Sequence, residues 1–193
     1  MTLSRLRHRF GGEGTVVTLS DDHAFTAAHC VAAVDGRRGT VLAGPDGHVW
    51  RMAKRWSPLG CDLALLHAEP SMHGRGVRSA RPTVTLAGAA VLRVGTPVVF
   101  IGFDAGRFQR RRAVVRSVTS THAIADVISA PGVRAGDSGG PVLVDGVLVG
   151  IVVARSGPPA SSGDGARSLV LARLDSPLMR RRAASALRPR VAR

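Results

Sequence analysis

Three short stretches of the sequence contain residue types that together can carry out acyl transfer by a serine hydroxyl. His29 lies in "TAAHC", Asp62 in "CDLALL" and Ser138 in "GDSGGP". Such a reaction needs a hydroxyl nucleophile, an imidazole that takes its proton, and a carboxylate that holds the imidazole in the right tautomer. We therefore predict Ser138 as the nucleophile, His29 as the general base and Asp62 as the residue that orients His29.

The residues around these three suit the same chemistry. Glycines beside Ser138 allow a tight turn and the close approach of a carbonyl group, and the N–H groups of Gly136 and Ser138 are predicted to form an oxyanion hole. Small residues at 26–28 allow the chain to pack tightly and to turn His29 towards a cleft. Asp62 opens a strongly apolar run, where a buried carboxylate requires a partner such as an imidazole N–H.

The elements that must position these residues are mostly strands. Short apolar or alternating runs bounded by Gly, Asp or Pro are typical of strands. In the first half of the chain these runs span 14–19, 39–44, 48–56 and 62–68, and in the second half 89–94, 96–103, 113–120, 123–129, 140–144 and 147–154. The Asp-Gly pair within 144–147 predicts a hairpin turn. A helix is predicted at 175–187, because Asp175-Ser176-Pro177 resembles a helix start.

A polar stretch rich in Gly and Pro, residues 69–82, predicts a linker between two β halves. The fold class predicted from this pattern is all-β, with two small antiparallel barrels or sandwiches. The N-terminal domain would span 1–78 and contain His29 and Asp62. The C-terminal domain would span 79–193 and contain Ser138, the helix and a basic tail.

The three motifs, in the order His, Asp, Ser, resemble those of the trypsin/chymotrypsin-type serine peptidases. The resemblance covers roughly residues 10–175. It implies two six-stranded antiparallel β-barrels with the active site between them, and a serine endopeptidase that works through an acyl-enzyme intermediate. It implies no cofactor and no metal. The substrate would be a protein or a peptide.

The resemblance also indicates where substrate specificity would lie. Gly132 stands where members that cut after Arg or Lys have an acid, six residues before the nucleophile. The predicted pocket comprises Gly132, Val133, Arg155 and Gly165. If Arg155 points into the pocket, it favours an acidic P1 residue by charge pairing; if it points out, the pocket favours an apolar P1 residue. The apolar P1 residue is the preferred interpretation, the acidic one comes second and a basic one third. Asp164 lies in the same loop and could neutralise Arg155.

The start of the chain does not resemble the Ile-Val-Gly-Gly terminus whose amine, in digestive members of the family, pairs with the aspartate before the serine. Asp137 would still need a cation if it is buried. We predict that an internal arginine, with Arg134 as the candidate, serves this purpose and that no zymogen cleavage is needed.

Cys30 and Cys61, the two cysteines, flank His29 and Asp62. In many members of the family the cysteine after the histidine pairs with one about sixteen residues earlier, where this chain has Gly14. A Cys30–Cys61 disulfide and two reduced thiols both remain open, and the reduced state is favoured because no secretory signal is visible. The histidines other than His29 show no metal-like clustering and are interpreted as surface residues.

The chain is strongly basic, with 27 Lys and Arg residues and a formal net charge of +14. Arginine is dense at 107–116 and 179–193, but the two stretches contain a single aromatic residue, Phe108, and no series of interleaved aromatics for base stacking, which argues against nucleic-acid binding as the main function. The tail could recruit an acidic partner. No apolar run approaches the ~20 residues of a membrane span. The basic N-terminus lacks a following apolar run, so we expect a cytoplasmic protein, or a secreted one if it is cut from a longer precursor.

Two rival functions use the same features. One is a protein-binding module that keeps the peptidase fold as a platform and presents its arginine-rich segments. The other is an esterase with the same triad. The intact triad and the intact glycines around Ser138 favour the peptidase.

Overall fold

The computed structural model describes residues 2–7, 13–20, 23–34, 40–43, 48–56, 61–68, 85–89, 91–104, 107–156 and 165–186. In the first half these form the strands β1 (Thr2–Arg7), β2 (Glu13–Thr18), β3 (His23–Ala27), β4 (Thr40–Ala43), β5 (His48–Trp56) and β6 (Leu63–Ala68), with a 3-10 helix η1 (Ala28–Val34). In the second half they form β7 (Pro97–Asp104), β8 (Arg107–Val118), β9 (His122–Val127), β10 (Pro141–Val144), β11 (Val147–Ser156), β12 (Ser168–Arg173) and the helix α1 (Pro177–Ala186). The predicted linker, Asp164 and the end of the basic tail lie outside these residues.

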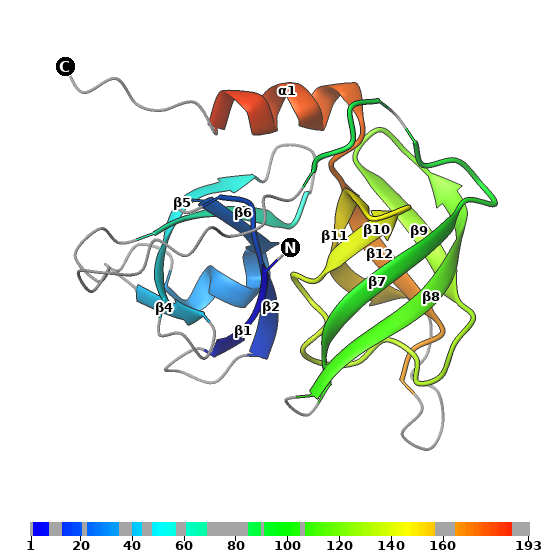
Figure 1. Ribbon diagram of the computed structural model, residues 1–193, viewed down its shortest axis with the longest axis horizontal. Helices are drawn as coiled ribbons and strands as arrows, with labels where there is room; N and C mark the ends of the chain where they lie inside the picture. The colour runs from blue at the N-terminus through cyan, green and yellow to red at the C-terminus, as the bar shows by residue number, and fades with distance from the viewer. Residues whose placement is uncertain are drawn as a thin grey trace.

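The second six strands form a closed antiparallel barrel in the order β10-β11-β12-β9-β8-β7 (Figure 1). Buried and exposed side chains alternate along β8, as expected for a strand of a closed barrel. Arg111, Ala113 and Val115 are buried, whereas Arg112 and Arg116 between and after them are exposed. Successive side chains of a strand point to opposite faces, so this pattern places one face of β8 in the barrel interior.

The first six strands pair in the order β1-β2-β3-β6-β5-β4, and pairing between β1 and β4 closes this ring. Side chains are described on β2, β3 and β6, which form a three-stranded antiparallel sheet. Nearly every described side chain of this sheet is buried on both faces. The reason is a shared core in which residues of this sheet pack with Leu148, Ile151 and Val153 of β11, so the second barrel covers the sheet.

The prediction of an all-β chain with a closed six-stranded antiparallel barrel and a short C-terminal helix is confirmed. The strand predicted at 89–94 is wrong: the backbone N–H groups of Val91 and Leu92 both donate to the Asp175 carboxylate, at 2.8 Å, and a turn follows at 94–95. The sequence pattern does not predict three of the observed strands, β1, β3 and β12. In β3 the sequence HAFTA has no clear alternation, and pairing on both sides decides its conformation.

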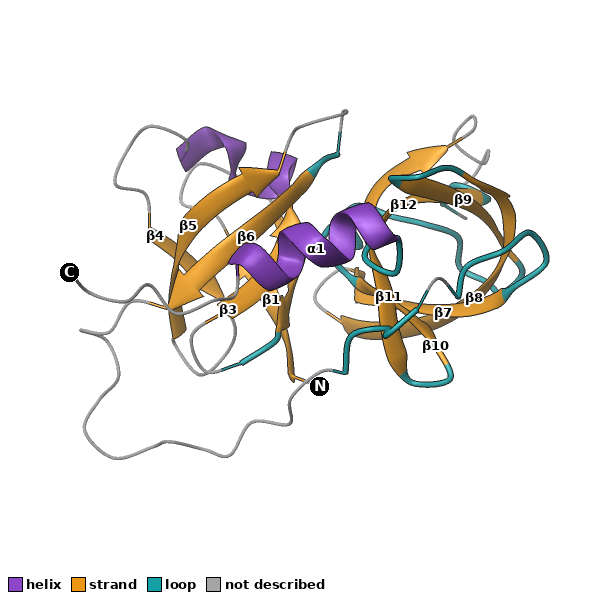
Figure 2. Cartoon of the chain, turned by 90° about the horizontal axis from the view of Figure 1, so that it is seen from above, coloured by secondary structure: helices purple, strands orange, loops and turns teal. Residues whose placement is uncertain are grey.

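Helix α1 begins beside the second barrel and runs towards the first six strands (Figures 1 and 2). Its start agrees with the prediction, since the Ser176 hydroxyl accepts a hydrogen bond from the Met179 N–H at 3.3 Å and Pro177 is the first helical residue. Met179 is buried in the shared core with Leu174. The helix therefore ties the end of the chain to both halves of the β structure.

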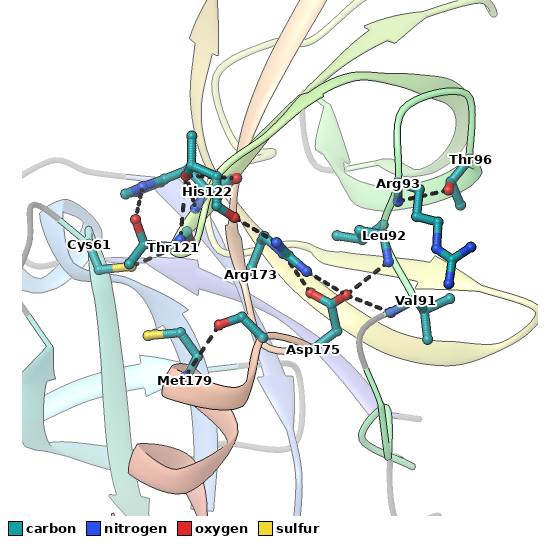
Figure 3. Close-up of polar contacts among 12 residues, drawn as sticks. Cys61, Val91, Leu92, Arg93, Thr96, Thr121, His122, Arg173, Asp175 and Met179 are labelled. Carbon is teal, nitrogen blue, oxygen red and sulfur yellow. Dashed lines mark hydrogen bonds and ion pairs between the residues drawn. The ribbon is translucent and has the colours of Figure 1, made fainter.

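A buried ion pair fixes the entry to this helix (Figure 3). The Arg173 guanidinium donates to both Asp175 carboxylate oxygens, at 2.8 and 3.0 Å, and to the Thr119 carbonyl at 2.6 Å. The same carboxylate accepts the two N–H groups of the 91–92 segment. Asp175 thus joins three segments that are far apart in the sequence.

We expect Asp175→Ala to lower the free energy of unfolding by about 3–5 kcal/mol, because it leaves the Arg173 charge buried without its counterion. Urea denaturation followed by circular dichroism measures this change. Arg116→Ala, which breaks the exposed Arg116–Asp126 pair, is the matched control and should cost at most about 1 kcal/mol. Equal effects of the two substitutions would contradict the assignment of the buried pair.

Candidate active site

The register of one strand pair brings His29 and Asp62 together. Strands β3 and β6 are antiparallel, and Ala27, the last residue of β3, lies opposite Leu63, the first residue of β6. The residues just beyond these ends therefore also face each other, and the Ala28 N–H donates to the Asp62 carbonyl at 3.1 Å. His29 follows in the first turn of η1. The sheet itself thus places an imidazole beside a carboxylate.

The Asp62 carboxylate holds His29 through both of its oxygens. The backbone N–H of His29 donates to Oδ1 at 2.8 Å, and the ring Nδ1 is hydrogen-bonded to Oδ2. The two side chains are 49% and 31% exposed, so the pair lies at the surface of the sheet rather than inside it. With Nδ1 engaged, Nε2 is the ring nitrogen left to exchange a proton with another group.

Cys30 lies between this imidazole and the turn that carries Ser138. Its Sγ is 3.5 Å from His29 Nε2 and 3.8 Å from the Ser138 carbonyl oxygen. Gly14 makes room for the sulfur, because a Cβ on Gly14 would lie only 2.7 Å from it. Cys30 and Cys61 are both free thiols, and Cys61 contacts the Thr121 carbonyl instead, at 3.7 Å. Of the two states left open by the sequence, the structure has the reduced one.

Ser138 lies in a tight turn between β9 and β10 that only glycines can form. Gly136 and Gly139 have φ angles of 97° and 86°, in the left-handed region that favours glycine. A Cβ on Gly136, Gly139 or Gly140 would collide with a backbone carbonyl of a neighbouring strand or segment. The Gly139 N–H donates to the Val152 carbonyl at 2.7 Å. Within the described part of the chain, the N–H groups of Gly136 and Ser138 donate to no protein acceptor.

Asp137, the residue before Ser138, is fully buried and pairs with Arg111. Arg111 reaches it from β8, donates a second hydrogen bond to the Gly132 carbonyl at 2.6 Å, and lies 4.9 Å from the centre of the Phe100 ring. The other Asp137 oxygen accepts the Arg134 backbone N–H at 2.7 Å.

The structure confirms an internal arginine on Asp137: the guanidinium of Arg111 contacts its carboxylate, and the expected Arg134 contacts it through its backbone N–H. The signal for Arg111 is present in the sequence. Arg111 lies two residues before Ala113 and four before Val115. Residues two apart share a face of a strand, so the sequence places Arg111 on the same face as these two apolar residues. The arginine-rich run around it conceals this signal, because such a run is typical of a basic surface.

Of the four residues predicted to line the substrate pocket, three lie together and the fourth, Arg155, is exposed. Val133 exchanges two backbone hydrogen bonds with Ala166, at 2.8 and 2.9 Å. A Cβ on Gly165 would lie 2.8 Å from the Val133 carbonyl and 2.9 Å from that of Gly132. These three predicted pocket residues are therefore neighbours. Arg155 is exposed on β11, opposite Leu169 of β12.

His122, one of the histidines interpreted as surface residues, is the first residue of β9, and the Asp62 charge acts on it. It is half-buried, its Nδ1 is 2.9 Å from the Thr121 hydroxyl, and burial lowers its pKa although the Asp62 charge acts in the opposite direction. Among the described residues, no group of three or more His, Cys, Asp or Glu side chains is arranged to hold a metal ion. No helix in the described ranges is both long and apolar enough to cross a membrane.

The hydrogen bond to Asp62, followed by that to Cys30, raises the pKa of His29 to about 10. A raised pKa favours the protonated imidazole, so its contribution to stability is complete below pH 6.5 and is lost as the pH rises through about 10. We expect the NMR titration of the His29 ring to have its midpoint well above 6.5, and Cys30→Ala to lower that midpoint.

His122 provides an internal control for this titration in the same spectrum. Its pKa is lowered, so its ring should titrate below the ordinary value in both proteins. A His29 midpoint near 6.5, or one unchanged by Cys30→Ala, would contradict the proposed contacts of the ring.

A family model and several solved structures are similar to this chain. The family model described as "Trypsin-like peptidase domain" matches residues 12–151. No curated protein sequence gives a match. Among solved structures, the active form of the Rv3671c protease from M. tuberculosis is similar, with a TM-score of 0.65, 21% identity and coverage of 89% of this chain and 75% of that chain.

Two further structures are similar along nearly the whole chain. The inactive form of the Rv3671c protease has a TM-score of 0.67 at 20% identity and covers 96% of this chain and 89% of that chain. A serine protease of human pathogenic astrovirus has a TM-score of 0.61 at 16% identity, with coverage of 97% and 93%. At these identities the likeness concerns the fold.

Proposed function

Because the chain belongs to the family of trypsin-like peptidase domains, we propose that it is a serine endopeptidase with Ser138 as nucleophile, His29 as general base and Asp62 as the orienting acid. The observation that carries this proposal is the double hydrogen bond between Asp62 and His29. It leaves Nε2 on the side of the ring where Cys30 contacts the Ser138 turn. The described contacts include no hydrogen bond between His29 and the Ser138 hydroxyl, and such bonds often tighten only when substrate binds.

In the proposed reaction the Ser138 hydroxyl attacks the scissile carbonyl and transfers its proton to Nε2 of the neutral form of His29, so the rate should rise with pH up to the His29 pKa of about 10. Asp62 stabilises the imidazolium that forms. The Gly136 and Ser138 N–H groups, which have no protein acceptor among the described residues, stabilise the oxyanion. His29 then protonates the leaving amine, and water releases the acyl group from Ser138 by the reverse sequence of proton transfers.

The two domains predicted from the sequence, 1–78 and 79–193, fit this scheme as two halves with the active site between them. His29 and Asp62 come from the first and Ser138 from the second. For specificity, we propose a pocket at Gly132, Val133 and Gly165 that favours an apolar P1 residue. The exposure of Arg155 supports this choice over an acidic P1 residue. An acidic partner for the tail remains a prediction, and residues 187–193 of that tail lie outside the described ranges.

We also propose that the intact chain is active without zymogen cleavage, because Arg111 already supplies the cation for Asp137. Labelling of the chain that still bears Met1 by a serine-directed fluorophosphonate tests this. If only a trimmed chain were labelled, the internal pair would be insufficient.

Cleavage of a denatured proteome by the wild type and by Ser138→Ala in parallel tests the proposed function. We expect new peptide termini with the wild type alone, and these cuts should follow mainly apolar residues. Hydrolysis of esters without any peptide cleavage would favour an esterase, and the absence of both reactions would favour a binding module. A clear preference for Arg or Lys would overturn the pocket assignment.

A further inference from the structure

We propose that Thr15 is a positioning residue for the oxyanion hole and that its hydroxyl sets the orientation of the turn that carries Ser138. This inference rests on the proposed function and deepens it. Thr15 is fully buried on β2, in the first half of the chain. Its hydroxyl donates to the Gly136 carbonyl at 2.8 Å, and its backbone N–H donates to the Ser138 carbonyl at 2.7 Å. One residue therefore holds the turn on both sides of Asp137.

The Arg111–Asp137 pair holds the middle of the turn, and the two Thr15 hydrogen bonds hold the residues on either side of Asp137. Gly136 has a φ of 97° and no side chain, so several orientations of its carbonyl are accessible to it. The Asp137 N–H donates a long hydrogen bond, 3.3 Å, to the Arg134 carbonyl. Fixing the carbonyls of Gly136 and Ser138 also fixes the residues whose N–H groups are proposed to bind the oxyanion. Such groups stabilise charge only when they are oriented before the reaction begins.

Thr15 is itself anchored to the strand that leads to the general base. Its carbonyl accepts a hydrogen bond from the Thr26 hydroxyl at 2.8 Å, and Thr26 lies on β3, three residues before His29. Gly139 packs so closely against the Thr15 carbonyl that a Cβ there would collide with it. Thr15 thus connects the strand of the proposed base with the turn of the proposed nucleophile.

The same strand contains a matched control. Thr18 is buried on β2 like Thr15, but its hydroxyl has no hydrogen-bond partner in the described part of the chain. Thr→Val keeps the shape of the side chain and removes only the hydroxyl. Any effect of losing a buried threonine hydroxyl from β2 in general should therefore appear at both positions, whereas an effect on the turn should appear only at Thr15.

The experiment compares Thr15→Val, Thr15→Ser and Thr18→Val, with p-nitrophenyl acetate as the acylating substrate. We expect Thr15→Val to lower kcat by roughly 10- to 100-fold with little change in KM, since removing an oxyanion donor outright costs about 100- to 1,000-fold. Thr15→Ser, which keeps the hydroxyl, should recover most of the rate, and Thr18→Val should match the wild type. The NMR titration of His29 should be the same in all variants.

The inference is overturned if folded Thr15→Val keeps the wild-type kcat, if only KM changes, or if Thr15→Ser is as slow as Thr15→Val. Should Thr15→Val fail to fold, Thr26→Val tests the same link, because it removes the anchor of Thr15 and should lower kcat several-fold. An unchanged kcat in that variant would also count against the inference. A wild type without a Ser138-dependent burst would instead contradict the proposed function itself.

Discussion

Replacing Ser138 by alanine is expected to lower the rate of peptide cleavage by roughly a millionfold, as the loss of a triad serine does in other peptidases. The substitution removes the atom that forms the acyl-enzyme bond. It leaves the fold intact, because the contacts that hold this residue, from Thr15 and Cys30, go to its backbone carbonyl. Cleavage rates measured on one peptide with both proteins, at matched circular dichroism, give the effect.

His29→Ala is the companion to this variant. If the two residues act in one proton transfer, the double variant should be no slower than either single variant, since groups that act as a unit are not additive. If the fold-reduction in the double variant equalled the product of the two single fold-reductions, the two residues would act separately. A Ser138→Ala protein that kept more than roughly a hundredth of the activity would rule out Ser138 as the nucleophile.

Arg111→Met should have the second largest effect, because it leaves the Asp137 carboxylate buried without its cation. We expect a loss of about 3–5 kcal/mol in the free energy of unfolding. Cleavage should also fall by roughly 100-fold or more, because Asp137 lies between the two proposed oxyanion donors and a displaced carboxylate would disturb both. Urea denaturation and cleavage rates measure the two effects separately.

Two further variants give this prediction its controls. Arg112→Met changes the exposed neighbour of Arg111 on the same strand and should alter neither stability nor rate. Arg111→Met combined with Asp137→Asn removes the unpaired charge and should recover part of the lost stability. If Arg111→Met and Arg112→Met behaved alike, the buried pair would have no part in holding the turn.

Motifs and local signals predict much of this molecule. The hairpin at 144–147 and the helix start at 175–177 depend on turn and capping chemistry that a few neighbouring residues determine. The meeting of His29 with Asp62 follows from strand register. That register depends on the whole sheet, so the motif order and the family resemblance, rather than the local pattern, allow the pair to be predicted.

The features that the sequence does not predict depend on long-range contacts. The segment 91–95 has an apolar pattern like a strand, but the buried Asp175 takes its backbone donors. Thr15 and Thr18 look alike in "GTVVTL", and only the position of the Ser138 turn distinguishes them. The roles of Asp175 and Thr15 both come from partners more than 80 residues away.

The arginines of this basic chain include both buried and exposed residues. Arg111 and Arg173 are buried counterions of Asp137 and Asp175, so part of the arginine content stabilises the interior. Other arginines of the 107–116 run, such as Arg112 and Arg116, are exposed. The arginine run at 107–116 therefore contains both a buried counterion and exposed surface residues, and only the position of each residue in the barrel distinguishes them.

The assignment of Ser138 as nucleophile is tested by mapping the adduct of a serine-directed fluorophosphonate on the intact, folded protein by peptide mass spectrometry. We expect one modified residue, Ser138, and loss of that modification in His29→Ala. Modification of a different residue, or an equal extent of modification at Ser138 without the imidazole, would contradict it.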